Sequence, residues 1–75
     1  METGWLNGAK VLGLWTIDQD RNAWVYLDTV GWRRIAFDND NIFFDMLTQL
    51  ASAKLTKSTV NVYQVDGVIT QIYVF

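Results

Sequence analysis

The high content of aromatic side chains limits the folds that are open to this sequence. Eleven of its 75 residues are Trp, Tyr or Phe, and 51% of its residues are hydrophobic. A domain of this size buries only about 60% of the surface that its unfolded chain exposes, while each aromatic side chain brings roughly 150–250 Å² to be covered. The sequence therefore predicts a folded domain whose interior cannot hold all of its aromatic side chains, so that some of them cover a partner.

The residue types that the chain lacks exclude several functions. It contains no Cys, no His and no Pro, so neither a disulfide nor a Cys/His metal site can supplement the core. Acid–base and nucleophilic catalysis lose their commonest side chains, and only Ser52 and Ser58 offer serine hydroxyls. The carboxylates that could serve a glycosidase-type site fall in expected turns rather than in an enclosed cleft; they are Asp18, Asp20, Asp38 and Asp40. We therefore expect a protein that is not an enzyme and that needs no cofactor.

The charge of the chain argues against two classes of partner. Its formal net charge is −2, which provides no field to attract phosphate backbones or anionic lipids. No run of about eighteen apolar residues is present to cross a bilayer. Nucleic acid and membrane insertion are therefore not expected. The cellular location stays open, although the absence of cysteine favours the cytoplasm.

Hydrophobic periodicity divides the chain into five strands and one helix within a single domain, residues 1–75. Alternating or β-branched runs separated by polar or glycine-containing breaks indicate the strands, and a long run without Gly or Pro indicates the helix. After a lead-in at residues 3–8, the expected strands are 11–17, 23–29, 32–37, 59–65 and 68–75, and the expected helix is 42–55. Strand-strand-strand-helix-strand-strand is the order of the OB-fold, a small, partly open Greek-key barrel.

Alternation and turn chemistry also predict faces and pairings. In the first strand, Val11 and Trp15 are two alternations apart and should share a face. In the second, Trp24 and Tyr26 should lie opposite Val25. The Asp66-Gly67 pair suits the positive φ angles of a type I′ hairpin. Such a hairpin would pair Val65 with Val68, Tyr63 with Thr70, and Asn61 with Ile72.

The expected helix has an apolar arc that is too wide for one neighbour. Asp and Asn at positions 38–41 supply capping side chains and negative charge at its start. At 100° per residue, its apolar side chains cover roughly 220° of the circumference, about twice what a one-sided amphipathic helix needs. We therefore expect the helix to contact both its own barrel and a second copy of the chain.

Within OB-folds, the second half of the sequence resembles the B subunits of the bacterial A-B toxins of the Shiga and pertussis types. The resemblance lies in an aromatic, leucine- and alanine-rich helix at 43–55, a Lys/Ser/Thr connection, an alternating strand at 59–62, and the run 69–73. Residues 8–17 are similar in kind to a first strand that opens with Gly-x-Lys-Val. This resemblance implies a five-membered ring with helices around a pore, paired edge strands and glycan binding. The chain departs from the toxin subunits in having no Cys, because those subunits are generally disulfide-bonded. No sugar-binding residue is carried over, because no binding motif matches.

Three groups of residues are candidates for a site. The aromatic and basic side chains of the second and third strands suit a sugar ring, which stacks on indoles, but these residue types favour a protein interface over a ligand site. They are Trp24, Tyr26, Trp32, Arg33 and Arg34. The side chains expected to contact another copy are Phe43, Phe44, Leu47, Ala51, Leu55, Tyr73 and Phe75. The stretch 18–22 resembles a calcium loop but has Ala23 and Thr29 where glycine and glutamate are required, so no metal site is expected.

The sequence thus favours a non-enzymatic OB-like domain that forms a homo-oligomeric ring, most simply a pentamer, with a binding or scaffolding role and a glycan as one ligand class. A first alternative is a monomeric OB- or SH3-like module whose exposed Trp, Tyr and Arg side chains bind a ligand. A second alternative is a single-stranded nucleic-acid binder, since aromatic side chains on an OB surface also stack bases.

Overall fold

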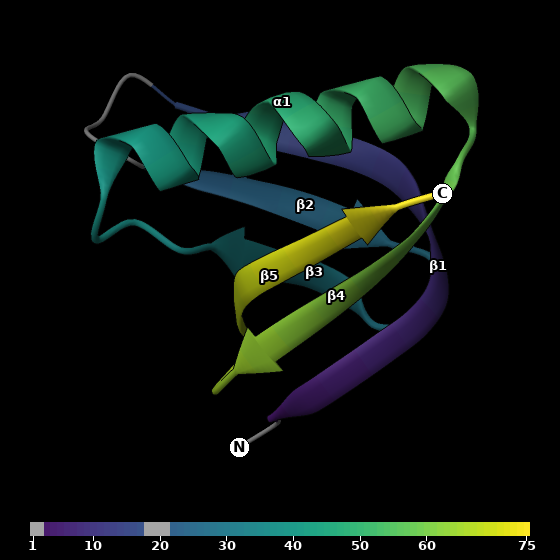
Figure 1. Cartoon of the computed structure of the whole chain (residues 1–75), viewed down its shortest axis with the longest axis horizontal. Helices are drawn as coiled ribbons and strands as arrows, with labels where there is room; N and C mark the ends of the chain where they lie inside the picture. Colours follow the sequence, from purple (N-terminus) through teal and green to yellow (C-terminus); the bar gives the residue numbers. More distant parts are fainter. Residues whose placement is uncertain (1–2, 18–21) are drawn as a thin grey trace.

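A computed structural model describes residues 3–17 and 22–75 of the chain. Within them it forms one helix and five strands in the predicted order (Figure 1). The elements are β1 (Gly4–Thr16), β2 (Ala23–Leu27), β3 (Gly31–Ile35), α1 (Asp40–Thr56), β4 (Thr59–Val65) and β5 (Val68–Val74). The calcium-like stretch considered above lies, except for Asn22, outside the described residues.

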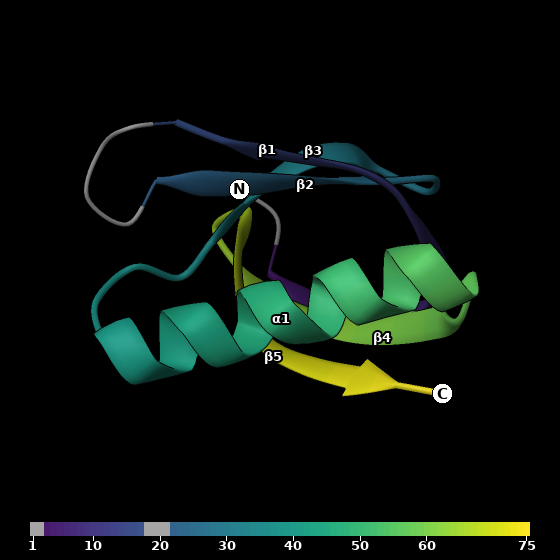
Figure 2. The ribbon, with the colours of Figure 1, turned by 90° about the horizontal axis from the view of Figure 1, so that it is seen from above.

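The five strands close into a barrel in the order β1-β2-β3-β5-β4. Neighbouring strands are antiparallel except β3 and β5, which run parallel and meet only at Arg34 with Val68 and Ile35 with Ile69. The two ends of β1 serve different partners, because its first half pairs with β4 and its second half with β2. The helix lies across one end of the barrel (Figures 1 and 2). This arrangement confirms the predicted OB-like barrel.

Strand β1 is longer than predicted and is bent by two irregularities. The lead-in expected at 3–8 is wrong, because the strand begins at Gly4 and Trp5 pairs with Tyr63 of β4. Its register shifts between Leu6 and Ala9, and Gly8 sits there with a φ of 72°. An extra residue in one strand bends it and increases its twist. Such a bend lets a single 13-residue strand contribute to both halves of the barrel.

The second irregularity of β1 overturns a predicted face. Its register against β2 shifts between Val11 and Gly13, so that Val11 pairs with Leu27 while Trp15 pairs with Trp24. Leu27 is buried, whereas Trp24 lies on the outer face. Val11 and Trp15 therefore lie on opposite faces of the sheet, because the extra residue at Leu12 reverses the alternation.

Strands β2 and β3 keep their predicted faces but are shorter than expected. Ala23, Val25 and Leu27 are fully buried, and Trp24 and Tyr26 point outward, as the alternation predicts. β2 ends at Leu27 instead of Thr29, and β3 ends at Ile35 instead of Phe37. The reversal between them occurs where predicted, with Gly31 at a φ of 83°. Only glycine adopts this region of φ without strain.

The helix begins two residues earlier than predicted and ends one residue later. The Asn39 side chain accepts a hydrogen bond from the Ile42 N–H at 3.1 Å, the N-cap that the polar stretch before it indicates. At the other end, Lys57 adopts a left-handed conformation and its N–H reaches the carbonyls of the last turn. The side chains that α1 buries on the barrel are Phe43, Met46, Leu50 and Ala53.

The β4–β5 hairpin has the predicted turn and a different register. Asp66 and Gly67 have φ angles of 53° and 78°, as a type I′ turn requires. Val65 faces Val68 as predicted. Farther from the turn the prediction is wrong, because a shift between Tyr63 and Gln64 places Tyr63 opposite Gln71 and Asn61 opposite Tyr73.

The barrel interior leaves most of the aromatic side chains outside. The buried core consists of aliphatic and small side chains from all five strands together with the inner face of α1. Of the eleven aromatic residues, all of which are described, Phe43 is buried and Trp24 and Tyr63 are half-buried. The other eight are exposed: Trp5, Trp15, Tyr26, Trp32, Phe37, Phe44, Tyr73 and Phe75. A single copy of the chain therefore covers few of its largest apolar side chains.

Candidate functional site

The outer face of β1, β2 and β3 carries a cluster of three indoles. The cross-strand pairs are Trp15 with Trp24, Trp24 with Arg34, and Tyr26 with Trp32. Directly opposed residues of neighbouring strands project to the same side of a sheet. We call these five side chains the indole surface. Trp24 and Trp32 separate two shallow hollows on it, of about 450 Å³ and about 530 Å³.

Contacts within the chain hold the indole surface in place. The ring of Trp32 meets Tyr26 edge-on, with centroids 5.2 Å apart and planes at 83°. The same ring extends across the sheet toward β1, where a carbon on Gly13 would lie 3.9 Å from it. The Trp24 Nε1–H donates to Asn22 Oδ1 at 3.0 Å. Indoles fixed in this way lose little further freedom when a ligand stacks on them.

Arg34 gives the indole surface a fixed cation. Its guanidinium lies over the ring of Phe37, 3.9 Å from the centroid. Among the described residues, its buried Nε–H has no hydrogen-bond acceptor. A buried donor without an acceptor destabilises the fold. A hydrogen bond from a charged donor such as this one is stronger than a neutral one, so a ligand acceptor that reaches it would bind favourably. The indole surface thus combines flat apolar rings with a guanidinium group that can donate a hydrogen bond to a ligand.

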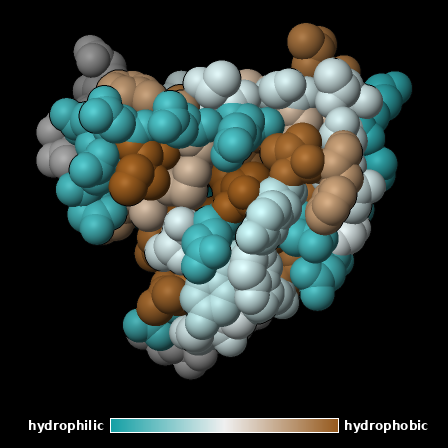
Figure 3. Space-filling view, in the orientation of Figure 1, coloured by the Kyte–Doolittle hydropathy of each residue, from teal (hydrophilic) through white to brown (hydrophobic). Residues whose placement is uncertain are grey.

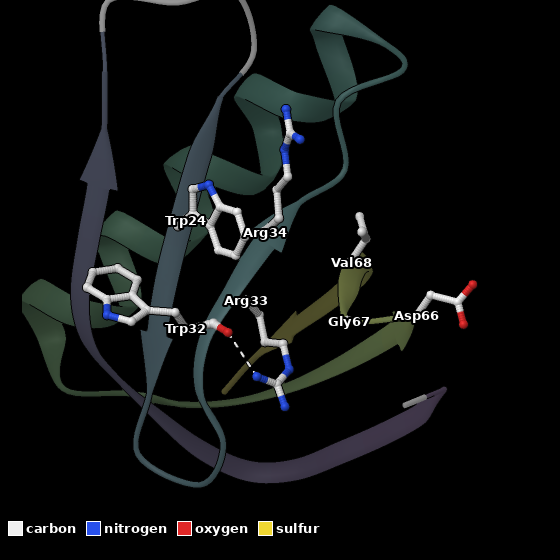
Figure 4. Close-up of a pocket in the computed structure, with 7 residues that line it drawn as sticks. All are labelled: Trp24, Trp32, Arg33, Arg34, Asp66, Gly67 and Val68. Atoms are coloured by element: carbon white, nitrogen blue, oxygen red, sulfur yellow. Dashed lines mark hydrogen bonds between the residues drawn. The ribbon is translucent and has the colours of Figure 1, made fainter. Parts of the chain in front are cut away.

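Arg33 occupies a different place from Arg34. Its Nε–H donates to Gln64 Oε1 at 3.0 Å, and its Nη1 donates to the carbonyls of Val30 and Trp32 at 3.1 and 2.8 Å. Gln64 is only 3% exposed, so Arg33 satisfies a polar side chain inside the barrel wall. In Figure 4 the two guanidinium groups point in opposite directions. Arg33 positions β3 against the β4–β5 turn, and Arg34 faces the indole surface.

The lining of the hollow between β2, β3 and the β4–β5 turn offers recognition rather than reaction chemistry. The hollow in Figure 4 is lined by Trp24, Trp32, Arg33, Arg34, Asp66, Gly67 and Val68. Asp66 is the carboxylate of this set, and none of the seven is a hydroxyl or thiol nucleophile. Within the described residues, no group of three acidic, His or Cys side chains is placed to hold a metal ion. Rings, two guanidinium groups and one carboxylate suit a ligand with flat apolar faces and polar substituents.

Two residues of this site are not placed correctly by the sequence prediction. The alternation of the first strand predicts Trp15 on the face of Val11, and the irregularity at Leu12 reverses this prediction. Phe37, which supports Arg34, was expected within the third strand but follows its end. An isolated glycine inside a strand pattern, here Gly13, is the signal that could have indicated the irregularity.

A second aromatic cluster lies on β1, β4 and β5. Trp5 contacts Tyr63 edge-on at 5.2 Å between centroids and stacks on Tyr73 at 5.7 Å with planes at 29°. A groove of about 500 Å³ runs beside it between α1 and β5, lined by Thr48, Gln49, Ser52, Ile72, Tyr73 and Val74. Figure 3 shows apolar patches on the face that carries α1 and β5, next to hydrophilic residues of the helix.

The residues expected at a subunit contact divide into two groups. Phe43 is buried in its own core and Leu47 is half-buried against it. The remaining five are exposed in the single chain: Phe44, Ala51, Leu55, Tyr73 and Phe75. Phe44, Ala51 and Leu55 are seven and four residues apart and form a stripe along α1. This helix stripe leaves apolar side chains facing outward over the length of the helix.

Comparison with known proteins adds no family. The sequence matches no protein-family model, and no curated protein matches it significantly. Among the described residues, no helix is long and apolar enough to span a bilayer. The function is therefore argued from the surfaces of this chain alone.

Proposed function

We propose that the protein is a non-enzymatic, homo-oligomeric binding or scaffolding protein whose copies form a ring, a pentamer in the pattern of the toxin B subunits that it resembles. The observation that carries the proposal is the exposure of eight of the eleven aromatic side chains. Monomeric soluble proteins rarely expose large contiguous apolar patches. Another copy of the chain is the simplest cover, because oligomerisation is a common way for a small domain to gain buried area.

In this proposal, one part of the surface forms the subunit contact and another part binds the ligand. The helix stripe and the C-terminal end of β5 supply the subunit contact, because Leu55 is 84% exposed and Phe75 71% exposed. The indole surface supplies the ligand site, because its rings are already held by contacts within the chain. Its ligand class is a glycan, whose C–H faces stack on indoles while its hydroxyls bind charged side chains.

Light scattering during size-exclusion chromatography tests the assembly. The wild-type chain should elute as one species of several times 8.6 kDa at micromolar concentration. Leu55→Asp should shift this species toward the monomer without unfolding it, since substitution at so exposed a position changes stability by about 0.5 kcal/mol or less. Thr29→Asp adds the same charge on the exposed β2–β3 turn and should assemble normally. A monodisperse wild-type monomer would refute the assembly.

A glycan array followed by tryptophan fluorescence titration tests the ligand class. Trp24→Ala should abolish the response to any glycan that binds. Trp5→Ala removes an exposed indole from the other aromatic cluster and should leave the response intact. Binding of oligonucleotides that weakens steeply with salt would instead indicate a single-stranded nucleic-acid site.

A monomeric ligand-binding module is the second candidate function. It is favoured by the order of the indole surface in a single copy, where Trp32 and Trp24 each have a partner within the chain. The two candidates differ in mass. A monomer whose red-shifted emission responds to ligand supports the module, and an assembly that dissociates on dilution supports the ring.

A further inference from the structure

The two ends of α1 carry opposite charge. Asp38 and Asp45 are exposed at its start. At its end lie Lys54 and Lys57, and Lys10 of β1 joins them because its Nζ donates to the Lys57 carbonyl at 2.7 Å. A helix of 17 residues is about 25 Å long at 1.5 Å per residue. The acidic end and the lysine end therefore lie on opposite sides of a molecule whose longest extent is 29 Å.

The three lysines at this end of the helix line one pocket and are not merely dispersed over the surface. Every lysine of the chain contributes to it, and a pocket of about 370 Å³ is lined by Lys10, Val11, Leu12, Lys54 and Lys57. No carboxylate belongs to this lining. Asp28 is engaged beside this lining, because its Oδ1 accepts the backbone N–H of Lys10 at 2.9 Å. Within the described residues, the ammonium groups of Lys54 and Lys57 have no hydrogen-bonded or ionic partner.

Each end also exposes apolar side chains beside its charges. Leu12 and Leu55 are 58% and 84% exposed near the lysines, and Ile42 and Phe44 are 51% and 57% exposed near the aspartates. Apolar side chains rimmed by charge are typical of protein contact sites. The two ends are therefore complementary in charge and alike in having apolar side chains to bury.

The helix dipole explains only part of this pattern. Acidic residues in the first turn and basic residues in the last turn stabilise a helix, which accounts for Asp40 and Lys54. The dipole gives no reason for Lys10 to join from β1. It also gives no reason for Leu12 and Leu55 to remain uncovered. A partner that is acidic and apolar would account for both.

We infer that the acidic end of one copy, with Ile42 and Phe44, docks on the lysine end of the next copy. The inference rests on the proposed self-assembly and names its contact. Because the two patches lie on opposite ends of one molecule, the contact is head-to-tail, and its repetition closes into a ring or extends as a chain. Two acidic ends or two lysine ends would repel each other, so a two-fold symmetric contact through one end is disfavoured.

Two charge-reversed variants of the full chain test this contact. Lys54→Glu with Lys57→Glu makes both ends acidic, and Asp38→Lys with Asp45→Lys makes both ends basic. Lys10 is kept because it caps the helix, and Asp40 is kept because it already has a partner. Each variant alone should assemble at least about tenfold more weakly than wild type, and an equimolar mixture should assemble more strongly than either variant alone. Circular dichroism checks that both variants are folded.

The outcomes separate this inference from the proposed assembly. If wild type assembles and either reversed variant assembles equally well alone, the head-to-tail contact is wrong while the assembly stands. A wild-type monomer would overturn both. Should the reversal of Lys54 and Lys57 leave assembly unchanged and abolish binding of inorganic phosphate instead, the pocket is an anion site and the inference fails. If either variant unfolds, Lys54→Gln and Asp45→Asn replace the reversals, and each should still weaken assembly.

Discussion

The two faces of β2 differ in a way that separates stability from recognition. On the inner face, Ala23, Val25 and Leu27 are fully buried and join the core. On the outer face, the larger side chains Trp24 and Tyr26 are half-buried or exposed. If stability of the single chain alone determined the sequence, the larger apolar side chains would be expected where most area can be buried. The comparison indicates that the inner face holds the fold and that the outer face is available to a partner.

The largest effect should come from the inner face. Leu27→Ala removes a fully buried side chain and leaves a cavity, so the free energy of unfolding should fall by about 2–5 kcal/mol. Urea denaturation followed by circular dichroism measures it. Tyr26→Ala, one residue away on the outer face, is the matched control and should cost clearly less. Equal losses at the two positions would contradict the division between the faces.

A smaller effect should arise where a polar group lies inside the barrel wall. Gln64→Ala removes the acceptor of the Arg33 Nε–H, and a buried donor left without an acceptor costs about 1–3 kcal/mol. Thermal unfolding measures the loss. Gln71→Ala changes an exposed glutamine of the neighbouring strand and should be nearly neutral. No difference between the two variants would mean that the Arg33 bond contributes nothing to closing the barrel.

The smallest effect on stability should come from the outer face, and it should be accompanied by a loss of binding. Trp32→Ala removes the edge-on contact with Tyr26, so the free energy of unfolding should fall by about 0.5–1.5 kcal/mol. Binding at the indole surface should be lost entirely, because Trp32 lines both hollows. Trp32→Phe should keep most of the stability and part of the binding. A variant that unfolds as readily as Leu27→Ala would place Trp32 in the core.

Local patterns predicted the element order, the inner and outer residues of β2, the helix cap and the type I′ turn. Each of these depends on a few neighbouring residues, such as Asn39 at the helix start or Asp66 and Gly67 in the turn. The register shifts of β1 and of the β4–β5 hairpin are not determined by a few neighbouring residues, although Gly13 marks one of them. They arise where one strand must bend to serve two neighbours in a closed barrel.

Those irregularities decide the composition of the candidate site. The shift near Leu12 turns Trp15 outward beside Trp24, and the shift between Tyr63 and Gln64 places Tyr73 opposite Asn61, on the side where Trp5 stacks on it. Arg33 and Arg34 are adjacent in sequence, and the alternation does place them on opposite faces. Their partners, Gln64 and Phe37, come from elsewhere in the chain and carry no local signal.

Hydroxyl-radical footprinting over a range of protein concentration tests most directly whether sister copies cover the exposed apolar side chains. Upon concentration, oxidation of Phe44, Tyr73 and Phe75 should fall several-fold. Oxidation of Trp24 and Trp32 should stay constant until a ligand is added. Unchanged oxidation of all five residues from the most dilute to the most concentrated sample would contradict the account.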